Sequence, residues 1–213
     1  MPTESSGLRY LALGDSYTVG HDVDPSARWP EQLAQRLRTD GIDIAAPRII
    51  ATTGWTTMHL ADAMDAAEPL GQWDFVTLLI GVNDQYDRDP VDLYRERFDA
   101  LLQRSIALTG GHAQRVLVVS IPDWGVTPFA QQDPHDPGAI ASEIDAYNAA
   151  AREVCDGLKV AFVDITPHSR THGAHPAMLV DDGLHPSALM YAAWADAVHP
   201  VARAALMRVD LRQ

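Results

Sequence analysis

The sequence predicts an α/β fold of three layers, in which a five-stranded parallel sheet lies between two layers of helices. Apolar, strand-like runs alternate with amphipathic segments along the whole chain, and this alternation is typical of parallel β-α-β units. The strand-like runs are also continuously apolar, as expected where helices cover both faces of a sheet. Because no linker, repeat or shift in composition interrupts the pattern, we expect one domain over residues 1–213.

Each predicted strand is a short apolar run that ends at small or polar residues, such as "LRYLALG" or "KVAFVDIT". The five strands are expected at residues 8–14, 47–54, 74–84, 113–123 and 159–166. Their β-branched and leucine-rich composition suits a buried parallel sheet.

The predicted helices show apolar residues three and four positions apart. They are expected at residues 29–41, 56–67, 89–108, 138–158 and 187–206. Pro30 lies in the first turn of one helix and Gly41 lies beyond its end, which is the usual placement of these two residues. Thr56 or Thr57 is expected to cap the second helix, and Pro200 to interrupt or bend the last one.

Charge and composition exclude several classes of function. The net charge of −13 disfavours binding to nucleic acid or to anionic lipid surfaces. No apolar run is long enough to span a membrane. The single cysteine, Cys155, lies in a helical pattern and is expected to be a buried thiol rather than a nucleophile. One unpaired cysteine and no signal-peptide pattern predict a cytoplasmic protein, whereas the oligomeric state stays open.

Small and polar residues follow the predicted strands, at the sheet edge where ligands of open parallel sheets bind. In chain order these ends hold residues 14–16, 52–55, 81–84 and 122–124, and the last strand leads on to Asp182 and His185.

Ser16, His185 and Asp182 together provide the groups that nucleophilic catalysis by serine requires. A serine hydroxyl needs a base to take its proton, and the base needs an acceptor that orients it. His185 can act as the base, and Asp182, three residues earlier, can reach its other ring nitrogen. Asp181 competes for the role of the acid, but the three-residue spacing favours Asp182.

Three groups are candidates to stabilise the oxyanion of a tetrahedral intermediate. These are the backbone N–H of Ser16 at a strand-to-helix turn, the backbone N–H of Gly54, and the side-chain amide of Asn83.

The blocks "GDS", "GWTT", "GVND" and "DGLHP" occur in this order over most of the chain. In this respect the sequence resembles the SGNH (GDSL-type) hydrolases, which are serine esterases and lipases on a flavodoxin-like sheet. The resemblance implies Ser16 as the nucleophile, Asp182 and His185 as the rest of the triad, and Ser16, Gly54 and Asn83 as the oxyanion donors. The G-x-S-x-G elbow of α/β-hydrolases is absent.

Two positions depart from the family pattern. Tyr17 stands where the name-giving pattern has leucine, a change expected to affect packing. The second block often has asparagine two residues before its glycine, whereas this chain has Thr52 there, and the bulky Trp55 follows the glycine. Asp15 and Asp84 are expected to hold their own turns together rather than to contact substrate.

Other groups admit more than one interpretation. The stretch "HSRTHGAH", with His168, His172 and His175, could supply metal ligands, but we interpret it as a polar loop and predict no metal and no cofactor. The long irregular segment 122–138 is typical of a binding loop or of disorder. Within or near such loops, Trp55 and Trp124 are candidates to line a substrate pocket.

The main hypothesis is therefore a cofactor-free esterase that acts on small-molecule carboxylic esters with short to medium acyl chains. Carbohydrate O-deacetylation, or lysophospholipase or thioesterase activity, are alternatives within the same family. A non-catalytic binding protein that has kept the fold is an alternative of another class, and a metal-dependent hydrolase using the histidine-rich stretch is a third.

Overall fold

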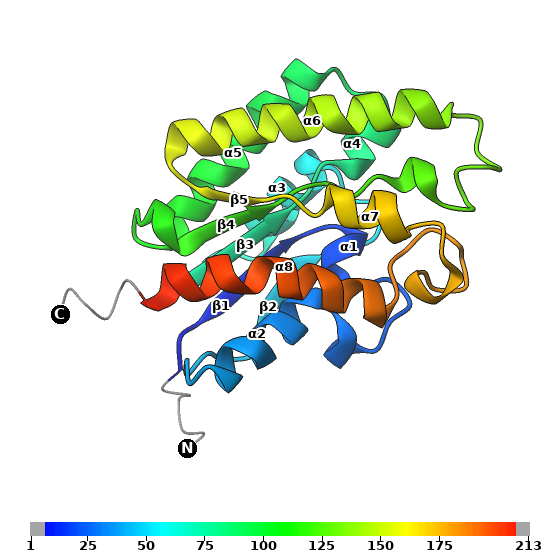
Figure 1. Ribbon diagram of the computed structural model, residues 1–213. Helices are drawn as coiled ribbons and strands as arrows, with labels where there is room; N and C mark the ends of the chain where they lie inside the picture. The colour runs from blue at the N-terminus through cyan, green and yellow to red at the C-terminus, as the bar shows by residue number, and fades with distance from the viewer. Residues whose placement is uncertain (1–6, 208–213) are drawn as a thin grey trace.

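Five parallel strands form the central sheet in the order β2-β1-β3-β4-β5 in a computed structural model that describes residues 7–207 (Figure 1). The strands are β1 (Tyr10–Gly14), β2 (Arg48–Ala51), β3 (Phe75–Leu79), β4 (Val116–Val119) and β5 (Ala161–Val163). This order is that of flavodoxin-like folds, and its topological switch point lies between β1 and β3. The predicted fold class is confirmed, and each strand is shorter than the apolar run that predicted it.

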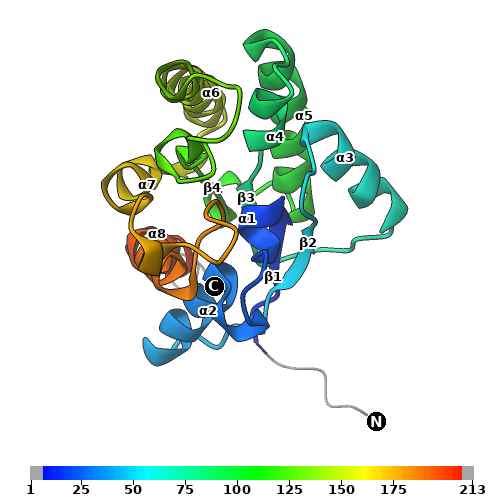
Figure 2. The same cartoon turned by 90° about the vertical axis from the view of Figure 1, so that its right-hand side faces the viewer.

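Helices cover both faces of the sheet (Figures 1 and 2). One layer contains α2 (Trp29–Thr39) and α8 (Ala188–Met207), which pack on each other. The other contains α3 (Thr57–Ala66), α5 (Val91–Leu108) and α6 (Pro137–Leu158). Shorter helices are α1 (Ser16–Val19), α4 (Val82–Tyr86) and α7 (Thr166–His172), with 3₁₀ turns at Pro25–Ala27, Ala113–Arg115, Trp124–Val126 and Pro176–Met178.

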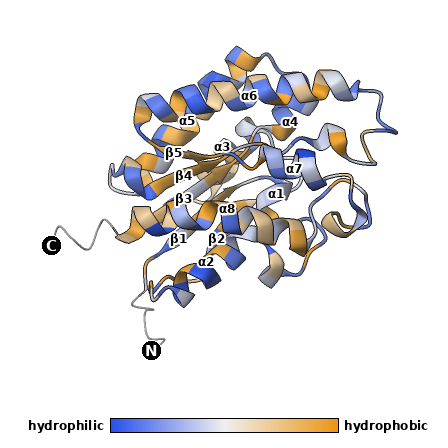
Figure 3. Ribbon diagram, viewed as in Figure 1, coloured by the Kyte–Doolittle hydropathy of each residue, from blue (hydrophilic) through white to orange (hydrophobic). Residues whose placement is uncertain are grey.

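The three central strands β1, β3 and β4 are buried along their whole length, whereas the edge strands β2 and β5 are partly exposed. Figure 3 shows the hydrophobic strands between helices that carry both hydrophilic and hydrophobic residues. The continuous apolar runs therefore correctly indicated burial on both faces of the sheet, and this burial is complete only in the central strands.

The strand register brings the ends of three strands together. Gly14 at the end of β1 pairs with Ala51 on β2 and with Leu79 on β3. The segments that follow these strands therefore begin at the same edge of the sheet, beside the switch point.

Two expectations about the helices need correction. Of the two outcomes expected at Pro200, an interruption is wrong, because α8 runs from Ala188 to Met207 with the proline inside it. Buried residues on both sides of the proline, such as Trp194 and Ala202, pack against the core and offset the lost hydrogen bond. The predicted polar loop around His168 is in part helix α7, which begins at Thr166 with Pro167 in its first turn, where the fixed φ of proline favours a helix.

No helix within residues 7–207 is both long enough and apolar enough to cross a membrane.

Candidate active site

Ser16 is the first residue of the short helix α1 and follows β1 by one residue. Gly14 makes this tight turn possible, because a Cβ atom at that position would lie 2.4 Å from the carbonyl oxygen of Leu79. Asp15 caps the helix, and its side chain accepts a hydrogen bond from the backbone N–H of Tyr17 at 3.0 Å. As the first helical residue, Ser16 has a backbone N–H without an acceptor inside the helix.

The Asp15 side chain is completely buried, and among the described residues its Oδ2 atom has no hydrogen-bond partner. Burial raises the pKa of Asp15 to about 8, although the hydrogen bond from Tyr17 acts to lower it. The hydrogen bond from Tyr17 to this enclosed carboxyl group agrees with the predicted role of holding the turn.

His185 and Asp182 form a close pair in the loop that precedes α8. The His185 Nδ1 atom lies 2.5 Å from Asp182 Oδ2. The other carboxylate oxygen, Asp182 Oδ1, accepts hydrogen bonds from the backbone N–H groups of Leu184 at 2.8 Å and His185 at 2.9 Å. The Asp-x-x-His spacing thus forms a self-contained loop, and no hydrogen bond of the imidazole Nε2 is found among the described residues. The neighbouring Asp181 is exposed, as Asp182 is, but makes no described hydrogen bond to His185.

The surroundings of this pair shift both pKa values downwards. Burial lowers the pKa of His185 below its ordinary value, although Asp182 acts to raise it. Partial burial acts to raise the pKa of Asp182, but the hydrogen bonds from His185 and Leu184 outweigh it and hold this pKa below the ordinary value. The pair therefore consists of a carboxylate and an imidazole that is neutral near neutral pH.

Asn83 lies on α4, directly after the strand β3 that pairs with β1. Its side-chain amide donates one hydrogen bond to the backbone carbonyl of Trp55 at 2.8 Å. An amide group has two N–H donors, so the second N–H of Asn83 has no acceptor among the described residues. Gly54, the residue before Trp55, has a φ of +85°, which glycine adopts without strain.

Asp84 ties the same two segments together more firmly. Its buried carboxylate accepts hydrogen bonds from the backbone N–H of Thr57 at 2.9 Å and from the Thr57 hydroxyl at 2.5 Å. The start of α3 is thereby fixed to α4, and the loop that contains Gly54 is held against Asn83. Asp84 thus has a structural contact, as expected, but it binds the start of α3 rather than its own turn.

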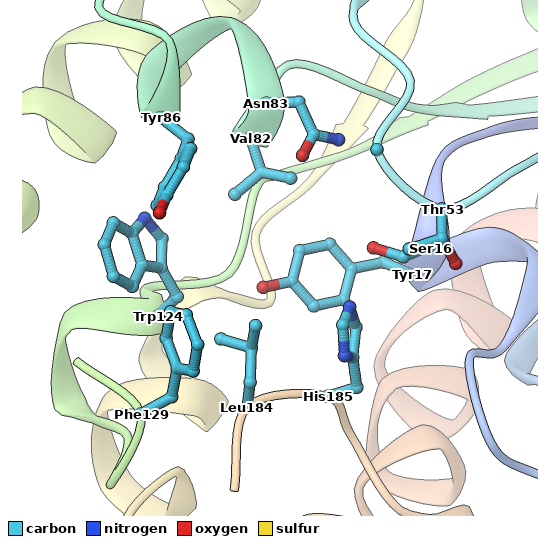
Figure 4. A pocket seen from close by; sticks show the side chains of 11 residues that line it. Ser16, Tyr17, Thr53, Val82, Asn83, Tyr86, Trp124, Phe129, Leu184 and His185 are labelled. Carbon is cyan, nitrogen blue, oxygen red and sulfur yellow. The ribbon is translucent and has the colours of Figure 1, made fainter. Parts of the chain in front are cut away.

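A pocket of about 210 Å³ opens at this edge of the sheet (Figure 4). Among the predicted site residues, Ser16, Gly54, Asn83, His185 and Trp124 line it. In Figure 4 Ser16 and His185 lie at one end, and Tyr86, Trp124 and Phe129 form an aromatic wall at the other. The remaining lining residues are Tyr17, Thr53, Val82 and Leu184.

The two tryptophans predicted for the pocket differ in their placement. Trp124 forms part of the wall, and its indole N–H donates to Gln85 Oε1 on α4 at 2.8 Å. Trp55 is not one of the lining residues in the described part of the chain, because its half-buried side chain packs against the hydrophobic core. Its contribution to the site is the backbone carbonyl that holds Asn83.

Segment 122–138 is packed against the site as well. It supplies Trp124 and Phe129 to the wall, and its Asp133 accepts a hydrogen bond from the hydroxyl of Tyr86 at 3.0 Å. The long irregular segment is therefore an ordered side of the pocket.

Sequence reasoning did not find Tyr86, Leu184 or His21 as members of the site. Tyr86 lies three positions after Asn83 on α4, which places both on one side of that helix, and Leu184 directly precedes His185. His21 lies next to the catalytic candidates, with 4.4 Å between its ring centroid and that of His185. Only its distance of five residues from Ser16 could have pointed to it.

His21, Asp182 and His185 are also the one group of three metal-ligating side chains found within residues 7–207, with donor atoms less than 4.8 Å apart. A metal ion there would compete with the 2.5 Å contact between His185 and Asp182. His168, His172 and His175 form no such group in the described residues.

Comparison with known proteins identifies the family. The model of the GDSL-like lipase/acylhydrolase family matches residues 12–193, which include every block noted above. The chain belongs to this family. It is accordingly a hydrolase that acts on ester bonds.

Solved structures agree with this fold at low sequence identity. TesA matches this GDSL-like hydrolase with a TM-score of 0.74 and 19% identity, over 93% of this chain and 99% of TesA. A mutant of Axe2, an acetyl-xylooligosaccharide esterase from Geobacillus Stearmophilus, matches with a TM-score of 0.69 and 20% identity, over 93% and 95% of the two chains. The psychrotrophic esterase EstA from Pseudoalteromonas sp., inhibited by monoethylphosphonate, matches with a TM-score of 0.64 and 15% identity, over 96% and 99%. No curated protein matches the chain.

Proposed function

We propose that this GDSL-like hydrolase is a serine carboxylesterase, with Ser16, His185 and Asp182 as its triad, that prefers carboxylic esters of short to medium acyl chains. One observation carries the proposal. Ser16 and His185 line the same pocket, and the Nδ1 atom of His185 lies 2.5 Å from Asp182 Oδ2. A hydroxyl, a neutral imidazole and an orienting carboxylate are the three parts that acyl transfer by serine needs.

In the proposed reaction His185 Nε2 takes the proton of Ser16 as the hydroxyl oxygen attacks the ester carbonyl. Asp182 keeps the Nδ1–H bond of the imidazole pointed at its own carboxylate, and it stabilises the imidazolium that forms. His185 then gives the proton to the departing alcohol. Water, activated by the same imidazole, hydrolyses the acyl-enzyme and regenerates Ser16.

Three N–H donors at the switch point are proposed to hold the oxyanion. These are the backbone N–H groups of Ser16 and Gly54 and the side-chain amide of Asn83. The hydrogen bond that the Asn83 amide donates to the Trp55 carbonyl, and the one that the Asp84 carboxylate accepts from the Thr57 N–H, fix these donors before substrate arrives. Such preorganisation lets donors stabilise developing charge without moving.

The proposed substrate preference follows from the pocket wall. Val82, Leu184 and the aromatic side chains of Tyr86, Trp124 and Phe129 leave few polar partners for sugar hydroxyl groups. A pocket of about 210 Å³ has room for a limited acyl group. Apolar esters are therefore favoured over the acetylated sugars that Axe2 is named for.

A panel of esters tests this preference. For p-nitrophenyl esters from acetate to laurate, we expect kcat/KM to be highest among the short and medium chains and to fall for the long ones, because the wall limits the acyl group. Acetylated xylo-oligosaccharides, assayed for released acetate, are expected to be poorer substrates than p-nitrophenyl acetate. A higher kcat/KM on the sugars would replace this proposal by O-deacetylation, and the Ser16→Ala protein serves as the blank.

Asn83→Ala is expected to lower kcat about 100- to 1,000-fold with a small change in KM, since an oxyanion donor acts mainly in the transition state. Asp84→Asn is the matched control, because Asp84 fixes the same loop but does not line the pocket. If Asp84→Asn lowers kcat as much as Asn83→Ala does, the loss reflects movement of the loop and Asn83 is not a donor.

The pH dependence of kcat/KM should report on His185 in the free enzyme. His185 must be neutral to accept the proton of Ser16, so activity is lost as pH falls through its pKa. Because burial lowers that pKa, we expect the midpoint of the acidic limb below the ordinary histidine value of 6.5. A pH–rate profile on p-nitrophenyl acetate measures it, and a midpoint well above 6.5 would contradict the assignment of His185 as base.

A further inference from the structure

His21 contacts three separate segments of the candidate site. It follows α1 after Gly20, and its backbone N–H donates to the carbonyl of Ser16 at 3.2 Å. Its ring packs on that of His185, with centroids 4.4 Å apart and planes inclined by 39°. Its Nδ1 atom lies 3.0 Å from the hydroxyl of Thr53, the residue before Gly54. The His21 side chain therefore contacts both His185, the proposed base, and the loop that contains Gly54, a proposed oxyanion donor.

We propose that His21 is a positioning residue that fixes the loop of Thr53 and Gly54 relative to His185. This inference rests on the proposed esterase function and adds to it a residue outside the triad and the three oxyanion donors.

The loop that contains Gly54 runs from the end of β2 at Ala51 to the start of α3 at Thr57, and its two ends are fixed by different hydrogen bonds. At its far end, the hydrogen bonds of Asn83 to Trp55 and of Asp84 to Thr57 fix it to α4. At its near end, directly after β2, the backbone N–H of Trp55 donates to the carbonyl of Thr52 at 3.3 Å, and the described hydrogen bond of the exposed Thr53 side chain is the one to His21.

Gly54 itself adds little support to the loop. A Cβ atom built on it would meet nothing within 4 Å, so no neighbouring group packs against its open side. The contact with His21 is thus the one side-chain hydrogen bond described for this end of the loop.

The charges around His21 suit the same role. Its Nε2 atom lies 3.5 Å from Asp22 Oδ2 and 4.0 Å from Asp182 Oδ2. If Nε2 carries the ring proton and faces these carboxylates, Nδ1 can accept a hydrogen bond from the Thr53 hydroxyl. His21 can in this way bind the loop while its ring packs on that of His185.

Small displacements at this point are costly to catalysis. A shift of about 1 Å in a reacting or stabilising group can lower the rate about a hundredfold. Loss of the hydrogen bond between His21 and Thr53 is expected to act on kcat rather than on KM, because Thr53 and Gly54 lie beside the oxyanion rather than along the aromatic wall.

The test uses His21→Ala, His21→Phe and Thr53→Val. Phenylalanine keeps a flat ring over His185 but has no nitrogen for Thr53, and valine keeps the shape of Thr53 without its hydroxyl. We expect each variant to lower kcat on p-nitrophenyl acetate by about ten- to a hundredfold, with KM changed by less than about threefold. Thermal unfolding should change little, since the His21 side chain is 34% exposed.

A double-mutant cycle is decisive for the coupling. If His21 acts through Thr53, the double variant His21→Ala/Thr53→Val should be no slower than the slower single variant, because residues that share one interaction are not additive. Multiplied effects would mean that the two residues act independently, and a His21→Phe enzyme with wild-type kcat would mean that the ring only packs. Either result overturns the inference.

The pH profile adds a readout that packing alone would not move. Burial lowers the pKa of His185 most, His21 lowers it further, and Asp182 and Asp22 act to raise it. Removing His21 should therefore move the acidic limb of kcat/KM to higher pH. Failure of the proposed function is recognised separately, because Ser16→Ala would then retain activity whatever the His21 variants do.

Discussion

Ser16→Ala should abolish turnover of p-nitrophenyl acetate while leaving the fold intact. Alanine removes the proposed nucleophile, and what remains is the small rate acceleration that binding and oxyanion donors give without a nucleophile, typically several orders of magnitude below the intact triad. No described hydrogen bond uses the Ser16 hydroxyl, so its loss should change the unfolding temperature little. Initial rates and thermal unfolding of the two proteins measure both effects.

Covalent labelling tests the role of Ser16 without a measurement of turnover. A fluorescent or ethyl phosphonate should add one covalent group to the wild-type protein, located at Ser16 by peptide mass spectrometry, and none to Ser16→Ala. Ser26→Ala, in an exposed 3₁₀ turn, is the control and should label like wild type. Labelling of Ser16→Ala at wild-type level, or retained ester turnover, would refute Ser16 as the nucleophile.

Much of the arrangement could be predicted because it depends on short-range patterns. Continuous apolar runs predicted the five strands, and parallel strands bring their carboxyl ends to one edge. This rule alone placed Ser16 after β1 and Asn83 after β3 beside each other. The spacing of Asp182 and His185 also suffices for their contact, because both lie in one tight loop.

The wall of the pocket could not be predicted in the same way. It depends on contacts between segments far apart in the sequence, such as the hydrogen bond from Trp124 to Gln85, 39 positions away, and that from Tyr86 to Asp133, 47 positions away. No periodicity within segment 122–138 carries this information. The residue type and the position next to predicted site loops made Trp124 and Trp55 equal candidates for the pocket. Only Trp124 lines it in the described structure, because Trp55 packs against the hydrophobic core.

Short helices were missed for a related reason. Helices α1 and α4 have four and five residues, which is too short for a repeating apolar pattern. They form because Asp15 caps one and because Asn83 and Asp84 bind the Gly54 loop at the start of the other. His21 was missed because its relation to His185 and Thr53 depends on the turn after α1.

Asp182→Asn should lower kcat about 10⁴-fold, the size of loss that a wrong imidazole tautomer causes in serine hydrolysis. Asparagine can keep an oxygen for the backbone N–H groups of Leu184 and His185, so the loop should retain its shape. The amide nitrogen then faces His185 Nδ1 as a donor. The imidazole must accept there and carry its proton on Nε2, where it cannot take the proton of Ser16.

Asp181→Asn separates this effect from a simple change of charge. It removes the same negative charge one residue away, from an exposed side chain that is not hydrogen-bonded to His185 in the described structure. We expect its kcat to stay within about twofold of wild type, because exposed charges interact weakly through water. Equal losses in the two variants would point to long-range electrostatics, and a nearly active Asp182→Asn enzyme would remove Asp182 from the triad. A large loss in Asp182→Asn alone requires the direct hydrogen bond to His185.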